Sequence, residues 1–346
     1  MSTEKVKPFL VSASKAELEA WCAGRGFPRF RADQIYKHIR ERLVLAPDGM
    51  NNIPKELKAA LAEDFFAPSS SIDAVDGSPD EVEKLRLCLH DGEMIEVAVI
   101  PMGDKRTLCL STQVGCPVQC RFCASGVGGL VRNLKCGEII EEFLWGCSRI
   151  GARCDNIVFM GIGEGLLNTK ELFSALDILT SGFGLSPRRI TVSTSGYIPG
   201  MEAFAKLKRE YNLAVSLHAP DDVTRAKLIP DPLRYSVGEI IKAADNYCES
   251  TGRQYTLEYT LIAGINDSIS HAKALGELAY RHHAKVNLIP YNDTASKYKR
   301  PALRDIEAFE KAVADTGARV TRRVEKGKRA SAACGQLRAA KVKAGE

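Results

Sequence analysis

The sequence has no long apolar run and no secretion signal. None of its apolar stretches approaches the ~20 residues that a membrane-spanning helix needs. The N-terminus, MSTEKVKPFL, lacks the charged and then apolar pattern of a signal peptide, so membrane insertion and secretion are not expected. With 346 residues, of which 45% are hydrophobic and 26% charged, the chain can bury a large core. We therefore expect a globular enzyme located in the cytoplasm.

An excess of charge of either sign is also lacking over most of the chain. The formal net charge is +5, but residues 321–346 alone hold eight Lys or Arg against two Glu. The rest of the chain is therefore close to neutral. A cationic terminal segment is either a solvated tail or a contact for a polyanion such as RNA, and charge alone does not decide between the two.

The eleven cysteines lack the pattern of a disulfide framework. Their number is odd and their spacing irregular, in a long chain without a signal peptide. This argues for reduced thiols, metal ligation or redox chemistry.

Residues 13–64 have the periodicity and end signals of a small helical module. Within it, the segment 27–42 interleaves aromatic side chains with basic ones, a mixture that suits base stacking and phosphate contacts. An amphipathic helix with a basic outer face is the simpler alternative. The basic residues of this segment are Arg29, Arg31, Lys37, Arg40 and Arg42. The turn-rich stretch 67–81 predicts a linker, and residues 83–101 alternate like an antiparallel hairpin with its turn at Asp91-Gly92.

From residue 107 onward, short apolar runs alternate with amphipathic helical patterns such as 137–150 and 169–180. Repeated βα units predict a parallel sheet, and right-handed crossovers curl such a sheet into a partial or complete α/β barrel with its chemistry at the carboxyl ends of the strands. An open doubly wound sheet is the main alternative, but no G-x-G-x-x-G follows the first strand. The expected strands are 107–112, 156–161, 189–195, 213–219, 255–264, 284–291 and 318–323.

Directly after the first of these strands, GCPVQCRFCASG places Cys116, Cys120 and Cys123 in a C-x3-C-x2-C spacing. Three thiolates can hold three irons of a [4Fe–4S] cluster and leave the fourth iron open to another ligand. A structural zinc site usually has four protein ligands, so zinc with a distant fourth ligand is the less favoured alternative.

The chain resembles, over essentially its whole length, the RlmN/Cfr family of radical S-adenosylmethionine (radical-SAM) adenine methyltransferases that act on 23S ribosomal RNA. Two departures are Gly165, where the family usually has proline, and the basic KRAS segment before Cys334. The motifs that carry the resemblance occur in the family's order: TLCLSTQVGCPVQCRFCASG (107–126), VRNL (131–134), VFMGIGEGLLN (158–168), RRITVSTSGYIPG (188–200), LAVSLHAPDD (213–222), KVNLIPYN (285–292) and AACGQL (332–337).

The resemblance implies an α/β fold, a radical-SAM partial or complete (β/α) barrel with a small helical N-terminal accessory domain that binds RNA. The expected parts are the accessory domain (1–75), a linker and hairpin (76–106), the barrel (107–325) and a basic C-terminal segment that carries the methyl-accepting cysteine (326–346).

The resemblance also implies two cofactors, one [4Fe–4S] cluster per chain and S-adenosylmethionine. Glycines in such turns are often only turn formers, and a lone barrel histidine is often simply hydrogen-bonded. Carried over residue by residue, the contacts to S-adenosylmethionine are Gly163, Glu164, Ser195, Ser216, Leu217, His218 and Asn292.

Three catalytic residues follow from the same resemblance. Cys334 accepts the methyl group, Cys109 is the second thiol that releases the product, and Glu96 takes a proton. Judged alone, Cys109 would be a small core residue and Glu96 a solvent-facing or salt-bridged carboxylate. The other cysteines have no matching role and are interpreted as ordinary thiols.

The implied reaction is methylation of carbon 2 of an adenosine in the peptidyl-transferase centre of 23S rRNA (position 2503), with adenosine 37 of some tRNAs as a further expected substrate. The alternatives are carbon-8 methylation of the same adenosine, as in the antibiotic-resistance branch, and a non-catalytic iron–sulfur RNA-binding protein. The expected partners are 23S rRNA before full ribosome assembly, tRNA and an external electron donor such as flavodoxin. We expect a monomer and no membrane contact.

Overall fold

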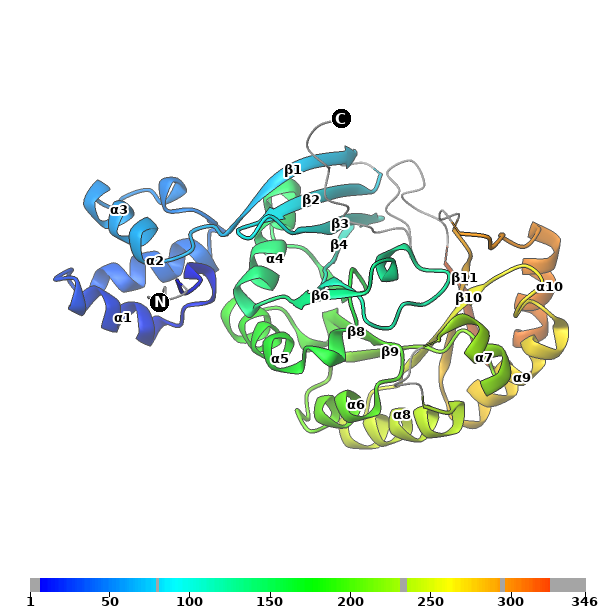
Figure 1. Cartoon of the computed structure of the whole chain (residues 1–346). Helices are drawn as coiled ribbons and strands as arrows, with labels where there is room; N and C mark the ends of the chain where they lie inside the picture. Colours follow the sequence, from blue (N-terminus) through cyan, green and yellow to red (C-terminus); the bar gives the residue numbers. More distant parts are fainter. Residues whose placement is uncertain (1–6, 79–80, 231–234, 293–295, 324–346) are drawn as a thin grey trace, which may run out of the picture.

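The computed structural model describes residues 7–78, 81–230, 235–292 and 296–323. Its first part is a small helical module set to one side of the barrel (Figure 1), as the periodicity of residues 13–64 predicted. Ser14 begins the first helix with a capping box, because its hydroxyl accepts from the Glu17 amide and the Glu17 carboxylate accepts from the Ser14 amide. The helices of the module are α1 (Lys15–Gly24), α2 (Phe30–Arg40) and α3 (Lys55–Asp64).

The stretch 67–81 contains a strand, so its interpretation as a linker is wrong. Strand β1 (Ser70–Gly77) forms one edge of the main sheet and pairs with its neighbour antiparallel. Most of its side chains are exposed or half-buried, so polar residues there lose little hydration and the usual apolar alternation is missing. Its first residue is held by the barrel, since the hydroxyl of Ser70 donates to the buried Glu141 carboxylate.

One curved sheet of ten strands organises the rest of the molecule. Strands β1 to β4 pair antiparallel, which confirms the predicted hairpin, and every pair from β4 to β12 is parallel. The order along the sheet is β1-β2-β3-β4-β7-β8-β9-β10-β11-β12. Besides β1, the strands are β2 (Glu83–Leu89), β3 (Met94–Met102), β4 (Lys105–Cys109), β7 (Asn156–Phe159), β8 (Ile190–Thr194), β9 (Asn212–Ser216), β10 (Thr256–Leu261), β11 (Lys285–Pro290) and β12 (Arg319–Arg322).

The longer crossover helices lie on the outer, convex side of this sheet (Figure 1). The described strands end at β1 on one edge and β12 on the other without pairing back, so the barrel is partial, within the predicted fold class. None of the described helices has the length and apolar character needed to cross a membrane. The barrel helices are α4 (Cys136–Ile150), α5 (Thr169–Asp177), α6 (Ile198–Ala205), α7 (Asp222–Leu228), α8 (Val237–Thr251), α9 (Ile269–Arg281) and α10 (Leu303–Ala314).

The strand register separates an apolar outer face from a more polar inner face. Leu108 points outward, and a Cβ at Gly146 of α4 would stand 2.6 Å from its side chain. Its neighbour Cys109 therefore faces inward, because successive strand residues alternate between faces. The inward set includes Ser216 and Glu258, which lie opposite each other on β9 and β10. The carboxyl ends of these strands surround the site.

Candidate cofactor site and catalytic residues

The three cysteines of the C-x3-C-x2-C motif lie on a tightly folded loop between β5 (Gln113–Gly115) and β6 (Leu130–Asn133). Gly115 has φ +75°, and a Cβ there would stand 2.1 Å from the carbonyl oxygen of Gly129. Cys116 closes the loop by donating its amide to that same oxygen at 3.0 Å. Only glycine fits position 115, so the sequence fixes a close loop from which the three thiols project.

Burial makes these thiols difficult to ionise on their own. It raises the pKa of Cys116 to about 12 and that of Cys120 well above its usual range, and the neighbouring thiols add to the effect. Thiolates here need nearby positive charge, which an iron–sulfur cluster supplies, so the donor set fits such a cluster. The part of the chain that is described holds no group of three or more His, Cys, Asp or Glu arranged around a single ion. Cluster cysteines bind separate irons and need not converge on one point.

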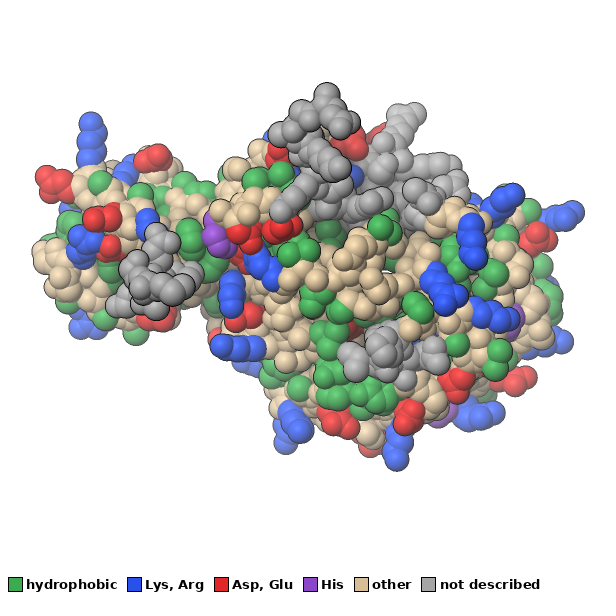
Figure 2. Space-filling view, in the orientation of Figure 1, with side chains coloured by type: hydrophobic (Ala, Val, Ile, Leu, Met, Phe, Trp, Pro, Cys, Tyr) green, Lys and Arg blue, Asp and Glu red, His purple; other side chains and the backbone are tan. Residues whose placement is uncertain are grey.

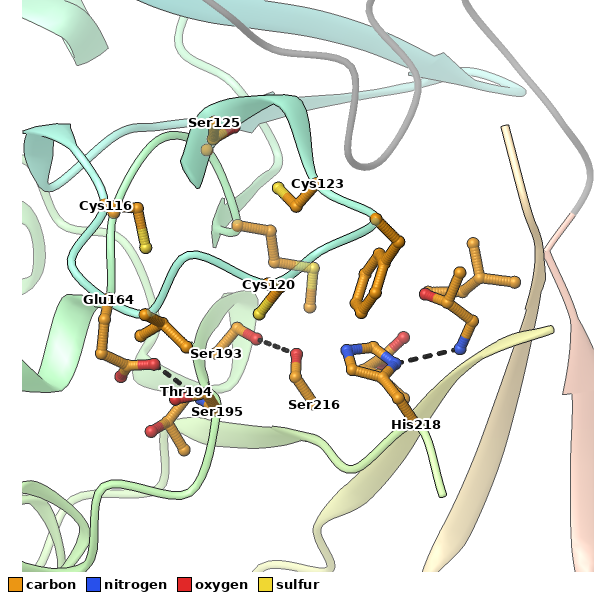
Figure 3. Close-up of a pocket in the computed structure, with 18 of the residues that line it drawn as sticks. Cys116, Cys120, Cys123, Ser125, Glu164, Ser193, Thr194, Ser195, Ser216 and His218 are labelled. Atoms are coloured by element: carbon orange, nitrogen blue, oxygen red, sulfur yellow. Dashed lines mark hydrogen bonds between the residues drawn. The ribbon is translucent and has the colours of Figure 1, made fainter. Parts of the chain in front are cut away.

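A pocket of about 920 Å³, including its open mouth, lies beside the loop at the carboxyl ends of the strands. The walls combine the loop that carries the three cysteines with residues from β7 to β11 (Figure 3). Of the residues predicted from the sequence, the structure brings together Cys116, Cys120, Cys123, Gly163, Glu164, Ser195, Ser216 and His218.

Gly163 is required by the packing of the turn after β7. It has φ +115°, and a Cβ would stand 2.7 Å from the Cβ of Gln113. The side-chain oxygen of Gln113 accepts from the Glu164 amide at 2.8 Å, which fixes the turn to β5. Gly163 thus forms the turn and also allows the Gln113 side chain to approach the backbone closely.

Glu164 is a buried carboxyl group at the wall of the pocket. One oxygen accepts from the Ser195 amide at 2.6 Å and the other from the Leu166 amide at 3.2 Å. Burial raises the pKa of Glu164, although these hydrogen bonds oppose the shift. Figure 3 shows the carboxyl group beside the Ser195 segment, on the far side of the pocket from His218. The arrangement can accept hydrogen bonds from a cationic group in the pocket.

His218 has a defined tautomer. Its Nδ1 accepts from the Thr260 amide at 3.0 Å (Figure 3), so in the neutral ring Nε2 carries the hydrogen. Burial lowers the pKa of His218 to about 3, with a smaller effect from Arg225, and the ring lies edge-on to Phe122 at 4.9 Å between centroids. The residue is therefore a hydrogen-bonded barrel histidine and a neutral pocket residue at the same time.

Cys109 and Glu96 face the same inner side of the sheet, next to the pocket but not in its lining. Cys109 lies opposite Ala98, two residues from Glu96, and packs with Met160, which does line the pocket. Glu96 is 3% exposed, and its carboxylate lies 3.1 Å from the Lys84 ammonium. Cys109 is thus packed among apolar side chains and Glu96 forms an ion pair, as the simpler interpretations expected. Both residues also lie beside the pocket.

The remaining predicted residues lie elsewhere. The Leu217 side chain packs in the main core and does not line the pocket. Asn292 is buried immediately after Tyr291, a lining residue. Cys334 lies outside the described residues.

Several lining residues were missed from the sequence. Glu258 and Thr260 project inward from β10, and Ser193 lies 3.4 Å from Ser216, hydroxyl to hydroxyl. Burial raises the pKa of Glu258 to about 7, although a hydrogen bond donated by the Asn287 side-chain amide at 2.6 Å opposes this shift. The signal was the polar alternation within the runs ITVSTS and TLEYTL.

The basic residues of the helical module divide into two groups. Phe30 is 52% exposed, with the Arg31 guanidinium 4.7 Å from its ring centre, and Arg29 is exposed nearby. Arg40 is instead buried, donates to the Val11 carbonyl at 2.8 Å and lies over the ring of Phe183 at 4.7 Å. Arg40 anchors the module to the barrel, so its interpretation as a phosphate contact is wrong.

Comparisons with known proteins match both parts of the chain. Residues 110–274 match the family model described as the radical SAM superfamily, and residues 10–66 match the ribosomal RNA large subunit methyltransferase N-terminal domain. The "Probable dual-specificity RNA methyltransferase RlmN" of Akkermansia muciniphila is 40% identical over 342 residues, covering 96% of this chain and 95% of that protein. Its namesake in Thermosynechococcus vestitus is 39% identical, covering 96% and 99%. The crystal structure of a radical SAM methyltransferase from Sphaerobacter thermophilus superposes with a TM-score of 0.92 at 39% identity, covering 96% of this chain and all of that one.

Proposed function

The chain belongs to the RlmN family of radical-SAM RNA methyltransferases, and from this premise we propose that it methylates carbon 2 of an adenosine in 23S ribosomal RNA. Enzymes of the radical SAM superfamily use a [4Fe–4S] cluster and S-adenosylmethionine, and this chain is such an enzyme. The observation that carries the proposal is the single pocket shared by the C-x3-C-x2-C cysteines and the strand-end residues Gly163, Glu164 and Ser195.

The residues of this pocket suit the two cofactors. We assign Cys116, Cys120 and Cys123 to the cluster and the carboxyl group of Glu164 to the ammonium of S-adenosylmethionine. When bound, the two cofactors would supply a radical, formed by reductive cleavage of S-adenosylmethionine, that removes a hydrogen atom. Adenine carbon 2 lies between two ring nitrogens and is electron-poor, so it cannot attack a methyl sulfonium directly. The remaining assignments to the cofactor are Gly163, Ser195, Ser216, Leu217, His218 and Asn292.

The methyl group reaches RNA through thiols of the chain. The Cys334 thiolate displaces the sulfonium sulfur and takes its methyl group, and the methyl carbon, after losing a hydrogen atom, bonds to carbon 2. Glu96 would then take the proton from carbon 2, and the one electron that the adduct loses would pass to the cluster held by Cys116, Cys120 and Cys123. Cys109 attacks the Cys334 sulfur and forms a disulfide, and the electron pair of the broken carbon–sulfur bond passes to the methylene carbon, which takes a proton.

The positions of Cys109 and Glu96 support these roles. Both face the inner side of the sheet, and Cys109 packs with Met160, a residue of the pocket wall. A thiol and a carboxylate needed only for packing would be as well placed on the outer face beneath the helices. Their nearness to the cofactor pocket is what the release of a covalent adduct requires.

RNA contact is assigned to the exposed aromatic and basic side chains of the helical module and to the cationic tail. Phe30 offers a ring for base stacking, and Arg29 and Arg31 offer phosphate contacts. Figure 2 shows Lys and Arg side chains spread over the module and the barrel, with several gathered at the right of the view. This distribution suits a large RNA more than a small molecule.

We also propose the wider partners of the reaction. The relatives are named dual-specificity RNA methyltransferases, which favours adenosine 37 of some tRNAs as a second substrate of this chain. We further propose that the enzyme is a cytoplasmic monomer, that it meets 23S rRNA before the ribosome is fully assembled, and that an external donor such as flavodoxin supplies the electron.

Product analysis tests the function. The protein is reconstituted with iron and sulfide without oxygen, then incubated with unmodified 23S rRNA, reductant and S-adenosylmethionine carrying a CD3 group. Nucleoside mass spectrometry should show 2-methyladenosine with two deuterium atoms, because one is removed and one solvent hydrogen is gained.

Three other results would contradict the proposal. A product with three deuterium atoms would exclude the thiol-bound methylene route. The 8-methyl isomer would place the chain in the other branch. No methylated adenosine from a protein with a full cluster would leave only RNA binding. Cys116→Ala is the negative control.

A further inference from the structure

Arg225 is a completely buried arginine next to the cluster loop. It lies on α7, is 1% exposed and is one of the largest fully buried side chains among the described residues. Burying a guanidinium is expensive unless its charge and its donors are used. No motif of the sequence singled it out, and none of the roles assigned above needs it.

Helix α7 packs directly on the cluster loop. The Arg121 amide, between two of the cluster cysteines, donates to the Leu228 carbonyl at the end of α7 at 3.0 Å. Leu228 also belongs to one apolar cluster with Val118 and Phe122 of that loop. Arg225 lies one helical turn before Leu228 and is therefore fixed relative to the cysteines.

The guanidinium holds the Ser195 segment from one side. One of its nitrogens donates to the Ser195 carbonyl and another to the Tyr235 carbonyl at 3.4 Å. From the other side, the Ser195 amide donates to Glu164 at 2.6 Å. A backbone unit that lines the cofactor pocket is thus clamped between a buried cation and a buried carboxyl group.

The charge of Arg225 also acts on His218, which lines the pocket. Burial lowers the pKa of His218, and the Arg225 guanidinium lowers it further. The packing of α7 on the cysteine loop places this cation beside the three thiols.

We propose that Arg225 is a positioning residue that makes the cluster easier to reduce and holds Ser195 in place for the cofactor. Reduction of the cluster adds one electron, taken from the external donor. A fixed cation in a water-poor site stabilises that added negative charge, so its loss lowers the reduction potential. This inference rests on the proposed assignment of the cluster to Cys116, Cys120 and Cys123.

The test compares three variants in the reconstituted protein without RNA. Arg225→Gln removes the charge, and Arg225→Lys keeps the charge but loses the two-pronged contact. Arg253→Gln is the matched control, because Arg253 is half-buried, donates to Asn212 at 2.5 Å and lies at the opposite ends of the strands. Redox titration followed by electron paramagnetic resonance gives the potential, and equilibrium dialysis gives the dissociation constant for S-adenosylmethionine.

The expected pattern separates charge from position. Arg225→Gln should shift the potential to more negative values and weaken cofactor binding at least tenfold. Arg225→Lys should keep the wild-type potential but weaken cofactor binding, and Arg253→Gln should change neither.

A wild-type potential in an Arg225→Gln protein with full iron content would overturn the inference. If that variant does not fold, Arg225→Lys decides, since unchanged cofactor binding would refute the clamp on Ser195. If the wild-type protein assembles no cluster, the proposed function fails instead.

Discussion

Replacing Gly163 by alanine should damage the cofactor pocket through a single methyl group added to the turn after β7. At φ +115° an L-residue is strained, which costs roughly 1–2 kcal/mol. The new Cβ would also stand 2.7 Å from the Cβ of Gln113 and from the Thr112 hydroxyl, and relieving such overpacking costs typically ~1–3 kcal/mol. The structure therefore predicts a loss of about 2–5 kcal/mol in the free energy of unfolding.

The same clash should displace Gln113, whose side-chain oxygen holds the Glu164 amide at 2.8 Å. S-adenosylmethionine affinity should therefore fall together with stability. Denaturant unfolding followed by circular dichroism measures the first effect, and calorimetric titration of the folded fraction measures the second.

Gly151→Ala is the matched control. Gly151 also has positive φ, +73°, but nothing lies within 4 Å of its Cβ position, so this variant should lose only the conformational part, about 1 kcal/mol, and should bind the cofactor normally. Equal losses in the two variants, or normal cofactor binding by Gly163→Ala, would refute the close-approach reasoning.

Three further predictions concern stiffness, pH and salt. Gly165→Pro should raise the free energy of unfolding by about 0.4–1 kcal/mol. Position 165 begins a 3-10 turn, and Glu164 before it is extended (φ −100°, ψ 102°), so proline fits the backbone there. A lower melting temperature would contradict this prediction. Burial raises the pKa of Glu141 from 4.5 to about 7. The protonated group therefore stabilises the fold by up to about 3 kcal/mol below pH 4.5, and this contribution is lost as the pH rises through 7. In Glu141→Gln, the free energy of unfolding should vary less between pH 5 and pH 8 than in the wild-type protein. RNA affinity in filter binding should fall steeply with salt, with Arg29→Gln reducing the log–log slope by about 1; a slope unchanged by Arg29→Gln would remove that residue from the interface.

The sequence predicted best what periodicity and short motifs encode. The helices of residues 13–64, the antiparallel hairpin and the succession of βα units are present as expected. The resemblance to the RlmN/Cfr family is confirmed by the comparisons. Each of these features is local, so it leaves a direct trace in the order of residues.

The features that the sequence did not predict depend on contacts between distant segments of the chain. Strand β1 forms a sheet edge, where polar residues are tolerated, and its own residues do not indicate that it pairs with β2. Arg40 carries the same charge as Arg29, but Phe183, far along the chain, covers it. Arg225 has no motif, and its importance depends on the packing of α7 against the cysteine loop.

The central claim is that this chain transfers a methyl group through its own thiols, and trapping the covalent adduct tests it most directly. Cys109→Ala retains Cys334 but lacks the thiol that releases it, so RNA should remain attached to the protein as a nuclease-sensitive band on a denaturing gel. Cys147→Ala, which removes another buried thiol, on α4 in the main core and not packed with the pocket wall, should turn over normally and give no such band. A Cys109→Ala enzyme that methylates RNA at the wild-type rate without an adduct would contradict the account.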